Sequence, residues 1–212
     1  MPQSNKSYFL DETFSTYNAA KSGINAIRIY RNWPVFFLDR LKMIHKNTDL
    51  IWLKNKVKYM FRPGTIDLVI INEVWNYKHY NPKDFQILPN DTVVDIGAHI
   101  GSFSVYAAKQ AIHGKVISFE PIPENYLLLK TNVEINSLKN VTIYNKAISA
   151  KKGYLDIYID PNSTGGHSAY NFAKSKRKIR VSSTTLPSLI NSLRLKKISF
   201  LKKFTAEFPQ RL

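Results

Sequence analysis

The sequence predicts an α/β protein built on a parallel β-sheet that helices cover on both faces. Three observations carry this prediction. From residue 92 onward, short apolar segments alternate with helical patterns at the spacing of strand–helix units. The first apolar segment runs directly into a glycine-containing turn, and the second ends on an acidic residue. The chain has 212 residues, 44% hydrophobic and 22% charged, as expected for an ordinary globular protein with about one domain.

We expect an N-terminal cap of helices and short strands over residues 1–88, followed by the α/β domain over residues 89–212. The boundary is the polar, proline-bearing stretch 81–92. Residues 23–46 carry apolar side chains at helical spacing, interrupted at Pro34, which predicts two amphipathic helices. The apolar positions of this pattern are Ile27, Tyr30, Phe37, Leu41 and Ile44. A helical cap packed on a core is the favoured interpretation, and a membrane helix is the alternative.

The sequence of the rest of the cap predicts a pair of strands. The segment "VKYMFRPGTIDLVIIN" (57–72) has apolar runs on both sides of Pro63-Gly64. A Pro-Gly pair is typical of a tight turn, so we expect two strands joined at that point.

Three strands and two helices make up the predicted centre of the α/β domain. The strands are expected at 92–96, 115–120 and 141–145, and the helices at 102–112 and 123–136. The first helix is rich in small residues, which lets it pack closely on the sheet. The second carries Leu129 and Val133 on one face.

The alternation of strands and helices then stops. Residues 153–160 alternate apolar and polar side chains, and "KIRVSSTTL" (178–186) reads as a returning strand, so we expect a hairpin-like excursion from the sheet. A short helix follows at 186–193, and "ISFL" (198–201) begins a fourth buried strand.

The turn after the first strand has the pattern D-x-G-x-x-x-G, with Asp95, Gly97 and Gly101. A dinucleotide site needs G-x-G-x-x-G, but His99 and Ser102 occupy the later glycine positions here. A side chain at residue 99 crowds the path of a pyrophosphate. The turn therefore favours S-adenosylmethionine, which carries no phosphate, and a tight connection without a ligand is the alternative.

An acid for the ribose of such a cofactor is present at the end of the second strand. Glu120 lies nineteen residues after Gly101 and is followed by Pro121. One carboxylate accepts hydrogen bonds from two vicinal hydroxyls, and the carboxyl ends of parallel strands meet at one crevice. The alternative interpretation of Glu120 is an ordinary solvent-facing acid.

These segments resemble the FkbM-type methyltransferases, which depend on S-adenosylmethionine. The resemblance is carried by "VVDIGAHIGSFSVYAAK", "GKVISFEPIPENYLLLKTNVEIN" and "VTIYNKAIS", extends upstream through "RPGTIDLVIINEV", and covers about residues 57–201. It implies the Rossmann-like sheet of the class I methyltransferases. It also implies methyl transfer to a hydroxyl oxygen of a sugar, a glycan or another small metabolite.

The resemblance also implies a set of cofactor-binding positions, which match the family turn, the ribose acid and the segment near the adenine. They are Asp95, Gly97, Ala98, His99, Gly101, Glu120, Pro121, Asn145 and Ala147. His99 replaces the asparagine that is more usual in the family, and Asp95 is expected to orient the turn or reach the amino group of the cofactor. Glu73 is a weaker candidate for the amino-acid end of the cofactor.

The resemblance stops abruptly after Lys202. Family members continue with an "FLKIDxEG"-like stretch, whereas this chain reads "FLKKFTAEFPQRL". We therefore expect a sheet that is incomplete after its fourth strand, as in a truncated or frameshifted version of a longer enzyme. A natural short variant completed by a partner is the alternative. The uncovered strand edge is expected to cause marginal stability and to favour homo-oligomers or aggregation.

No catalytic base is assigned. With the family's downstream acids missing, the candidates are Asp160, His167 and His99, of which His167 lies in the glycine-flanked loop "STGGHSAY". The chain has no cysteine, and its five histidines form no ligand-spaced pair, so no metal site is expected.

The net charge is +16, and residues 171–212 hold eleven Lys or Arg and one acid. This favours a solvated basic face, with attraction to RNA, an anionic membrane surface or a phosphorylated substrate as the alternative. An RNA methyltransferase and a cofactor-binding remnant without turnover are thus the two alternatives to a methyltransferase acting on a small molecule or glycan.

With no membrane-length apolar run, no secretory signal pattern and no cysteine, the chain is expected to be cytoplasmic.

Overall fold

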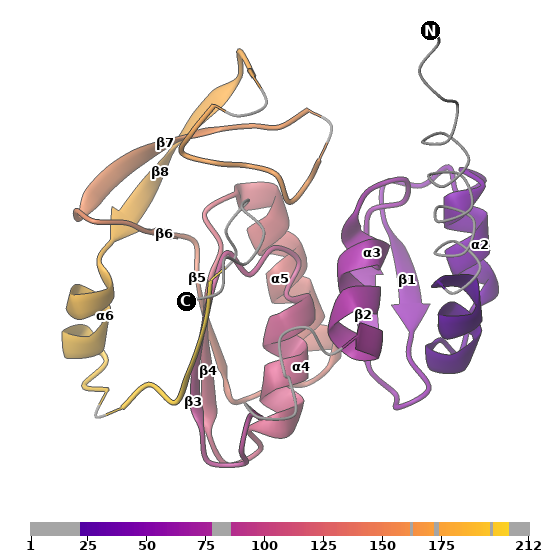
Figure 1. Ribbon diagram of the computed structural model, residues 1–212, viewed down its shortest axis with the longest axis horizontal. Coiled ribbons are helices and arrows are strands. Elements are labelled where there is room, and N and C mark those ends of the chain that lie inside the picture. Colours follow the sequence, from indigo (N-terminus) through magenta and orange to yellow (C-terminus); the bar gives the residue numbers. More distant parts are fainter. Residues whose placement is uncertain (1–21, 78–85, 162, 172–173, 196, 204–212) are drawn as a thin grey trace, which may run out of the picture.

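A four-stranded parallel sheet forms the centre of the protein. The computed structural model describes residues 22–77, 86–161, 163–171, 174–195 and 197–203. The strands of the central sheet are β3 (Thr92–Ile96), β4 (Lys115–Phe119), β5 (Val141–Tyr144) and β9 (Phe200–Lys203). They lie in the order β5-β4-β3-β9, and each neighbouring pair is parallel (Figure 1).

This order is that of a Rossmann-like sheet. The chain starts at β3, winds outward through β4 and β5, and returns to place β9 on the other side of β3. The direction of winding therefore reverses between β3 and β9, which is where open α/β sheets form their binding crevice. The predicted fold class is confirmed.

Helices cover both faces of the sheet. On one face lie α4 (Ser102–Gln110) and α5 (Pro123–Ile135), and on the other lies α6 (Leu186–Ser192) (Figure 1). Side chains of successive strand residues point to opposite faces of the sheet. Val93 packs in a core with Phe103 of α4, and Val94 packs in a core with Leu189 of α6.

Close packing of α5 explains the glycine that precedes α4. Gly101 has φ of 84°, and a Cβ at this residue would lie 2.5 Å from Cδ1 of Leu129. A larger residue would therefore be strained by the backbone and would have to displace the Leu129 side chain of α5. The predicted apolar face of α5 is correct, since Leu129 and Val133 are both buried.

The predicted hairpin-like excursion is also correct. β7 (Gly153–Tyr158) and β8 (Lys178–Thr184) pair antiparallel. β6 (Ala147–Ile148), which the sequence analysis did not predict, adds a short parallel strand to β8. Inward side chains of this second sheet, including Ile157 and Val181, pack on Ile122 at the start of α5.

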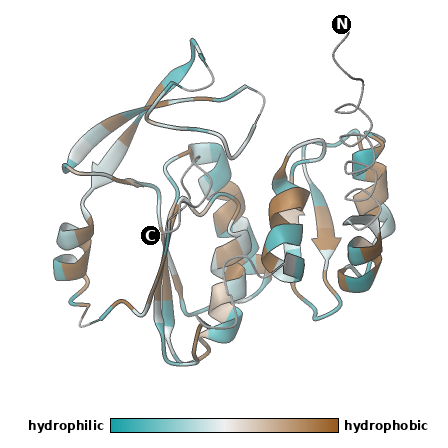
Figure 2. Cartoon of the chain, viewed as in Figure 1, coloured by the Kyte–Doolittle hydropathy of each residue, from teal (hydrophilic) through white to brown (hydrophobic). Residues whose placement is uncertain are grey.

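The cap consists of helices around a two-stranded sheet. Residues 22–29 are helical, and the other cap elements are α2 (Pro34–Arg40), β1 (Asp49–Trp52), β2 (Lys58–Phe61), α3 (Asp67–Asn72) and the π-helix η1 (Glu73–Tyr77). β1 and β2 are antiparallel, and the largely hydrophobic strand β1 lies between α2 and α3 (Figure 1 and Figure 2). Among the described residues, none of the helices has the length and apolar character needed to cross a bilayer.

Two predictions for the cap were wrong in part. The segment after Pro63-Gly64 is the helix α3, not a strand, because Leu68 and Ile71, three residues apart, form its buried face. A short apolar run does not distinguish a strand from a helix by its pattern alone. The two predicted N-terminal helices are present, but Ile27 and Leu41 are 45% and 67% exposed, so they do not face the core.

The cap and the α/β domain share a hydrophobic core, in which Tyr59 and Phe61 of β2 pack with Ile100 and Leu128. The division of the chain into two domains stays a prediction. Within the described part of the chain, β9 pairs on one side only, with β3. The expected oligomers or aggregates through this strand also stay a prediction.

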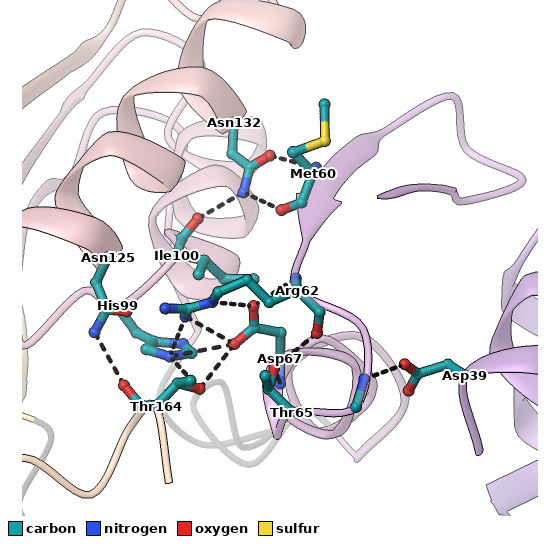
Figure 3. A network of polar contacts seen from close by, with 11 residues as sticks. Asp39, Met60, Arg62, Thr65, Asp67, His99, Ile100, Asn125, Asn132 and Thr164 are labelled. Carbon is teal, nitrogen blue, oxygen red and sulfur yellow. Dashed lines mark hydrogen bonds and ion pairs between the residues drawn. The ribbon is translucent and has the colours of Figure 1, made fainter. Parts of the chain in front are cut away.

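Asn132 of α5 fastens the cap to the α/β domain (Figure 3). Its Nδ2 donates to the carbonyl oxygens of Met60 and Ile100 at 3.0 and 2.8 Å, and its Oδ1 accepts from the Met60 N–H at 2.6 Å. The side chain is fully buried, so no water can replace these bonds.

We predict that Asn132→Ala lowers the free energy of unfolding by about 2–4 kcal/mol, because it leaves backbone groups of Met60 and the buried carbonyl oxygen of Ile100 without partners. Urea denaturation measures this change. The matched control is Thr131→Ala, one residue earlier in α5, where the half-buried side chain makes one solvent-exposed bond to the Leu127 carbonyl oxygen. An effect of Asn132→Ala no larger than that of the control would contradict the assigned role.

Candidate functional site

A cavity of about 330 Å³ lies at the carboxyl ends of β3 and β4. Its floor is formed by Gly97 of the turn and by residues 119–122. One wall comes from residues 146–148 and from β7, and residues 164–170 of the loop after β7 cover it. The cavity therefore occupies the crevice that the strand order predicts.

The glycine turn has an unusual backbone. Gly97, His99 and Gly101 all have positive φ, of 74°, 55° and 84°. The N–H groups of Gly97 and Ala98 both donate to the carbonyl oxygen of Phe119 at 2.9 Å, which ties the turn to the end of β4. Histidine and asparagine tolerate the left-handed conformation better than most residues, so His99 suits this position of the turn.

Glu120 lies buried at the edge of the cavity, with 4% of its surface exposed. Its Oε2 accepts from the backbone N–H of His99 at 2.7 Å, and its Oε1 accepts from that of Ile122 at 2.9 Å. Burial raises the pKa of Glu120 to about 7, although both N–H groups act against this shift. The alternative of an ordinary solvent-facing acid is therefore wrong.

Asp95 lies behind the turn and not in the cavity wall. It is fully buried, with Oδ2 accepting from the Ser104 hydroxyl at 2.7 Å and Oδ1 lying 2.9 Å from Nζ of Lys202. Lys202 also donates to the carbonyl oxygen of Gly97 at 3.3 Å. The Asp95–Lys202 pair thus joins β9 to the glycine turn and holds the turn in place from the side of the sheet.

The remaining positions from the family resemblance have different surroundings. Pro121 and Ala147 line the cavity. Asn145 is exposed, and its Nδ2 donates to the carbonyl oxygens of Glu120 and Pro121 at 2.8 and 3.2 Å, so it supports the wall from outside. Ala98 packs under the turn in a small core with Leu129.

A buried polar network, which no local pattern in the sequence predicts, links the cap to the cavity (Figure 3). Asp67 of α3 is fully buried and accepts from Nε and Nη2 of Arg62, both at 3.0 Å. Its Oδ1 also accepts from the Thr164 hydroxyl at 3.0 Å and lies 3.4 Å from Nε2 of His99. Asp67 therefore contacts both the turn and the loop that covers the cavity.

The charges in this network have a clear arrangement. Burial raises the pKa of Asp67, but the bonds and charge of Arg62 outweigh it, so the pKa lies below its ordinary value. Burial lowers the pKa of His99 to about 4, and the nearby Asp67 only partly opposes this. At neutral pH the network therefore holds one carboxylate, one guanidinium and an uncharged imidazole.

The same network fixes the covering loop. Besides its bond to Asp67, Thr164 offers its carbonyl oxygen to Nδ2 of Asn125 at 3.0 Å. Residues 67 and 164 are 97 positions apart, and nothing in either segment alone indicates the contact.

The three candidate bases lie near one another. His99 and His167 both line the cavity, and Nδ1 of His167 accepts from the backbone N–H of Asp160 at 3.0 Å. Burial lowers the pKa of His167, which keeps it neutral at pH 7. Asp160 lines a neighbouring cavity, also of about 330 Å³. Glu73, the weaker candidate, begins η1 and does not line the cavity.

Comparison with known proteins identifies the family. Residues 95–202, slightly more than half of the chain, match the methyltransferase FkbM domain. The chain belongs to the FkbM methyltransferase family. The matched region contains the glycine turn, Glu120 and Lys202, and the cap lies outside it.

Individual relatives cover only parts of this FkbM-family chain. Methyltransferase sdnD of Sordaria araneosa is 34% identical over 95 residues, which are 44% of this chain and 37% of that protein. Methyltransferase 1 of Beauveria bassiana is 24% identical over 102 residues, 48% of this chain and 40% of that protein. The chain thus matches well under half of the length of these relatives. The crystal structure of TYW2 from P. horikoshii with MeSAdo matches 50% of this chain and 39% of its own, at 23% identity and a TM-score of 0.40.

We predict that Asp67→Asn lowers the free energy of unfolding by about 3 kcal/mol, because Arg62 and the turn lose a buried carboxylate. Chemical denaturation measures the change. Asp156→Asn is the matched control, since it breaks the exposed ion pair with Lys178 and is expected to leave the midpoint nearly unchanged. Equal midpoints for the two variants would show that the network does not hold the cap to the turn.

Proposed function

We propose that this FkbM-family protein binds S-adenosylmethionine in the cavity beside Glu120 and transfers its methyl group to a hydroxyl oxygen of a small metabolite or glycan. The observation that carries the proposal is the buried carboxylate of Glu120, held by two backbone N–H groups. Each of its oxygens has a further lone pair, which a ribose hydroxyl can use.

The charge and shape of the cavity support this cofactor over a phosphate-bearing one. A buried carboxylate at the cavity edge disfavours an anionic phosphate and favours a neutral sugar or a cationic sulfonium. Ile148, Leu155 and Ile157 form an apolar wall that suits the flat face of an adenine. The side chain of His99 lies where a dinucleotide fingerprint has glycine.

The roles of the residues follow from these positions. When bound, the cofactor supplies a methyl group on a positively charged sulfur, ready for attack by an oxygen. Glu120 binds and orients the ribose, and Asp95 with Lys202 fixes the turn below it. Thr164 and its loop line the cavity, and the bond from the Thr164 hydroxyl to Asp67 holds this loop beside the turn. The base that accepts the proton of the acceptor hydroxyl is one of Asp160, His167 and His99. Because Nδ1 of the neutral His167 already accepts from the Asp160 N–H, His167 can take this role only when that bond opens.

An RNA acceptor is the second candidate, favoured by the basic segment before and along β8. Lys174, Lys176, Arg177, Lys178 and Arg180 are all exposed in this segment. Methylation of RNA, with an RNA affinity that falls steeply as salt is added, would select this alternative. Cofactor binding without methyl release on pooled metabolites or RNA would instead select the remnant without turnover.

We predict that the affinity for S-adenosylmethionine rises about tenfold between pH 6 and pH 8. The pKa of Glu120 is raised to about 7, and only the ionised carboxylate accepts both ribose hydroxyls, so binding strengthens as pH rises through this value. Isothermal titration calorimetry at the two pH values measures the change.

Glu120→Gln is expected to weaken binding at pH 8 by at least about tenfold and to remove the pH dependence. Glu134→Gln, an exposed residue of α5, is the matched control and should behave as the parent. Tight binding by Glu120→Gln, or no binding by well-folded parent protein, would overturn the proposal.

A further inference from the structure

The outer side of the cap exposes an unusual concentration of apolar side chains. Thirteen large apolar residues are exposed in the described part of the chain, and six of them lie between residues 24 and 43. They are Ile24, Ile27, Trp33, Leu38, Leu41 and Met43. Single exposed apolar residues are ordinary, but a cluster of them marks a surface that contacts another molecule.

Packing contacts join these residues into one surface. A Cβ at Gly23 would lie 3.3 Å from the ring of Phe37, so the first helix packs directly against α2. Trp33 contacts the same ring edge-on, with centroids 5.7 Å apart. The Met43 N–H donates to the carbonyl oxygen of Leu38 at 2.8 Å, which folds the following turn back along α2. We call residues 22–46 the cap surface, and Figures 1 and 2 place its helices on the side of the cap away from the parallel sheet.

The cap surface is also strongly basic. Its exposed charged residues are Arg28, Arg31, Arg40, Lys42 and Lys46. The sole acid in this stretch of sequence is Asp39, which is buried and accepts from the Gly64 N–H at 2.6 Å. Lys46 lies 3.8 Å from Asp49. Residues 22–46 offer no exposed acid to the other four basic residues. Exposed apolar and cationic residues thus alternate along this segment of the cap.

We propose that the cap surface binds the face of an anionic lipid bilayer, with its two short helices lying in the plane of the interface. Leucine, isoleucine, methionine and tryptophan side chains gain by entering the boundary between headgroups and acyl chains. Arginine and lysine side chains between them contact lipid phosphates and carboxylates, each basic residue contributing about a fivefold gain in partitioning.

Two other occupants fit this surface less well. A nucleic acid would satisfy the basic residues but would leave the exposed aliphatic side chains in water. A second copy of the chain would cover the aliphatic side chains but would bring two basic surfaces together, where like charges repel. An anionic bilayer satisfies both kinds of side chain.

Vesicle co-sedimentation tests this proposal on the full chain. We expect binding to vesicles of phosphatidylcholine with about one-third phosphatidylserine, little binding to phosphatidylcholine alone, and weakening between roughly 0.1 and 0.5 M salt. Arg40→Gln with Lys42→Gln should weaken partitioning about 25-fold. Leu41→Ser with Met43→Ser should weaken it at least about tenfold.

The control is Leu127→Ser with Lys130→Gln, which replaces one exposed apolar and one exposed basic residue of α5. It should partition as the parent does, and equal thermal midpoints will show that all variants are folded. The proposal is overturned if the parent does not bind phosphatidylserine vesicles, or if the control weakens binding as much as the cap variants. It is also overturned if the Leu41→Ser, Met43→Ser variant changes the oligomeric state by light scattering, since a second copy would then occupy the surface.

Discussion

The hydrogen bond from the His99 N–H to the carboxylate of Glu120 connects every part of the site. This hydrogen bond requires a left-handed backbone conformation at His99, and it requires the end of β4 to lie beside the glycine turn. The turn is held from below by Asp95 and Lys202, and from the cap side by Asp67 through the ring of His99. A change in any of these supports moves the carboxylate on which the proposed recognition of ribose depends.

The cap is part of this arrangement, although it lies outside the region that matches the family domain. Asn132 bonds the backbone of β2 to that of the turn at Ile100, and Asp67 reaches the loop that covers the cavity. Buried polar networks of this kind are costly when half satisfied, which favours a single arrangement of the three segments. The cap therefore helps to shape the cavity, and the cap surface on its other side remains available to a different partner.

Much of the α/β domain could be predicted from sequence because its signals are local. Strand–helix alternation located β3, β4, β5 and the helices between them, and the spacing of Gly101 and Glu120 located the crevice. The strand predicted after Gly64 failed because a short apolar run fits either period until Leu68 and Ile71 are seen to share a buried face. The Asp67–His99–Thr164 contacts could not be predicted from the sequence, because they depend on tertiary packing between segments far apart in the chain. Asp95 illustrates a third limit: its place at the strand end was predictable, but its burial against Lys202 was not.

The most direct test of this account is a crystal structure of the protein with S-adenosylhomocysteine. We expect the two ribose hydroxyls to donate to the Oε1 and Oε2 atoms of Glu120 at about 2.6–3.0 Å, with the adenine against Ile148 and Leu155. A ligand bound away from Glu120, or a ribose that turns its hydroxyls away from this carboxylate, would contradict the central claim.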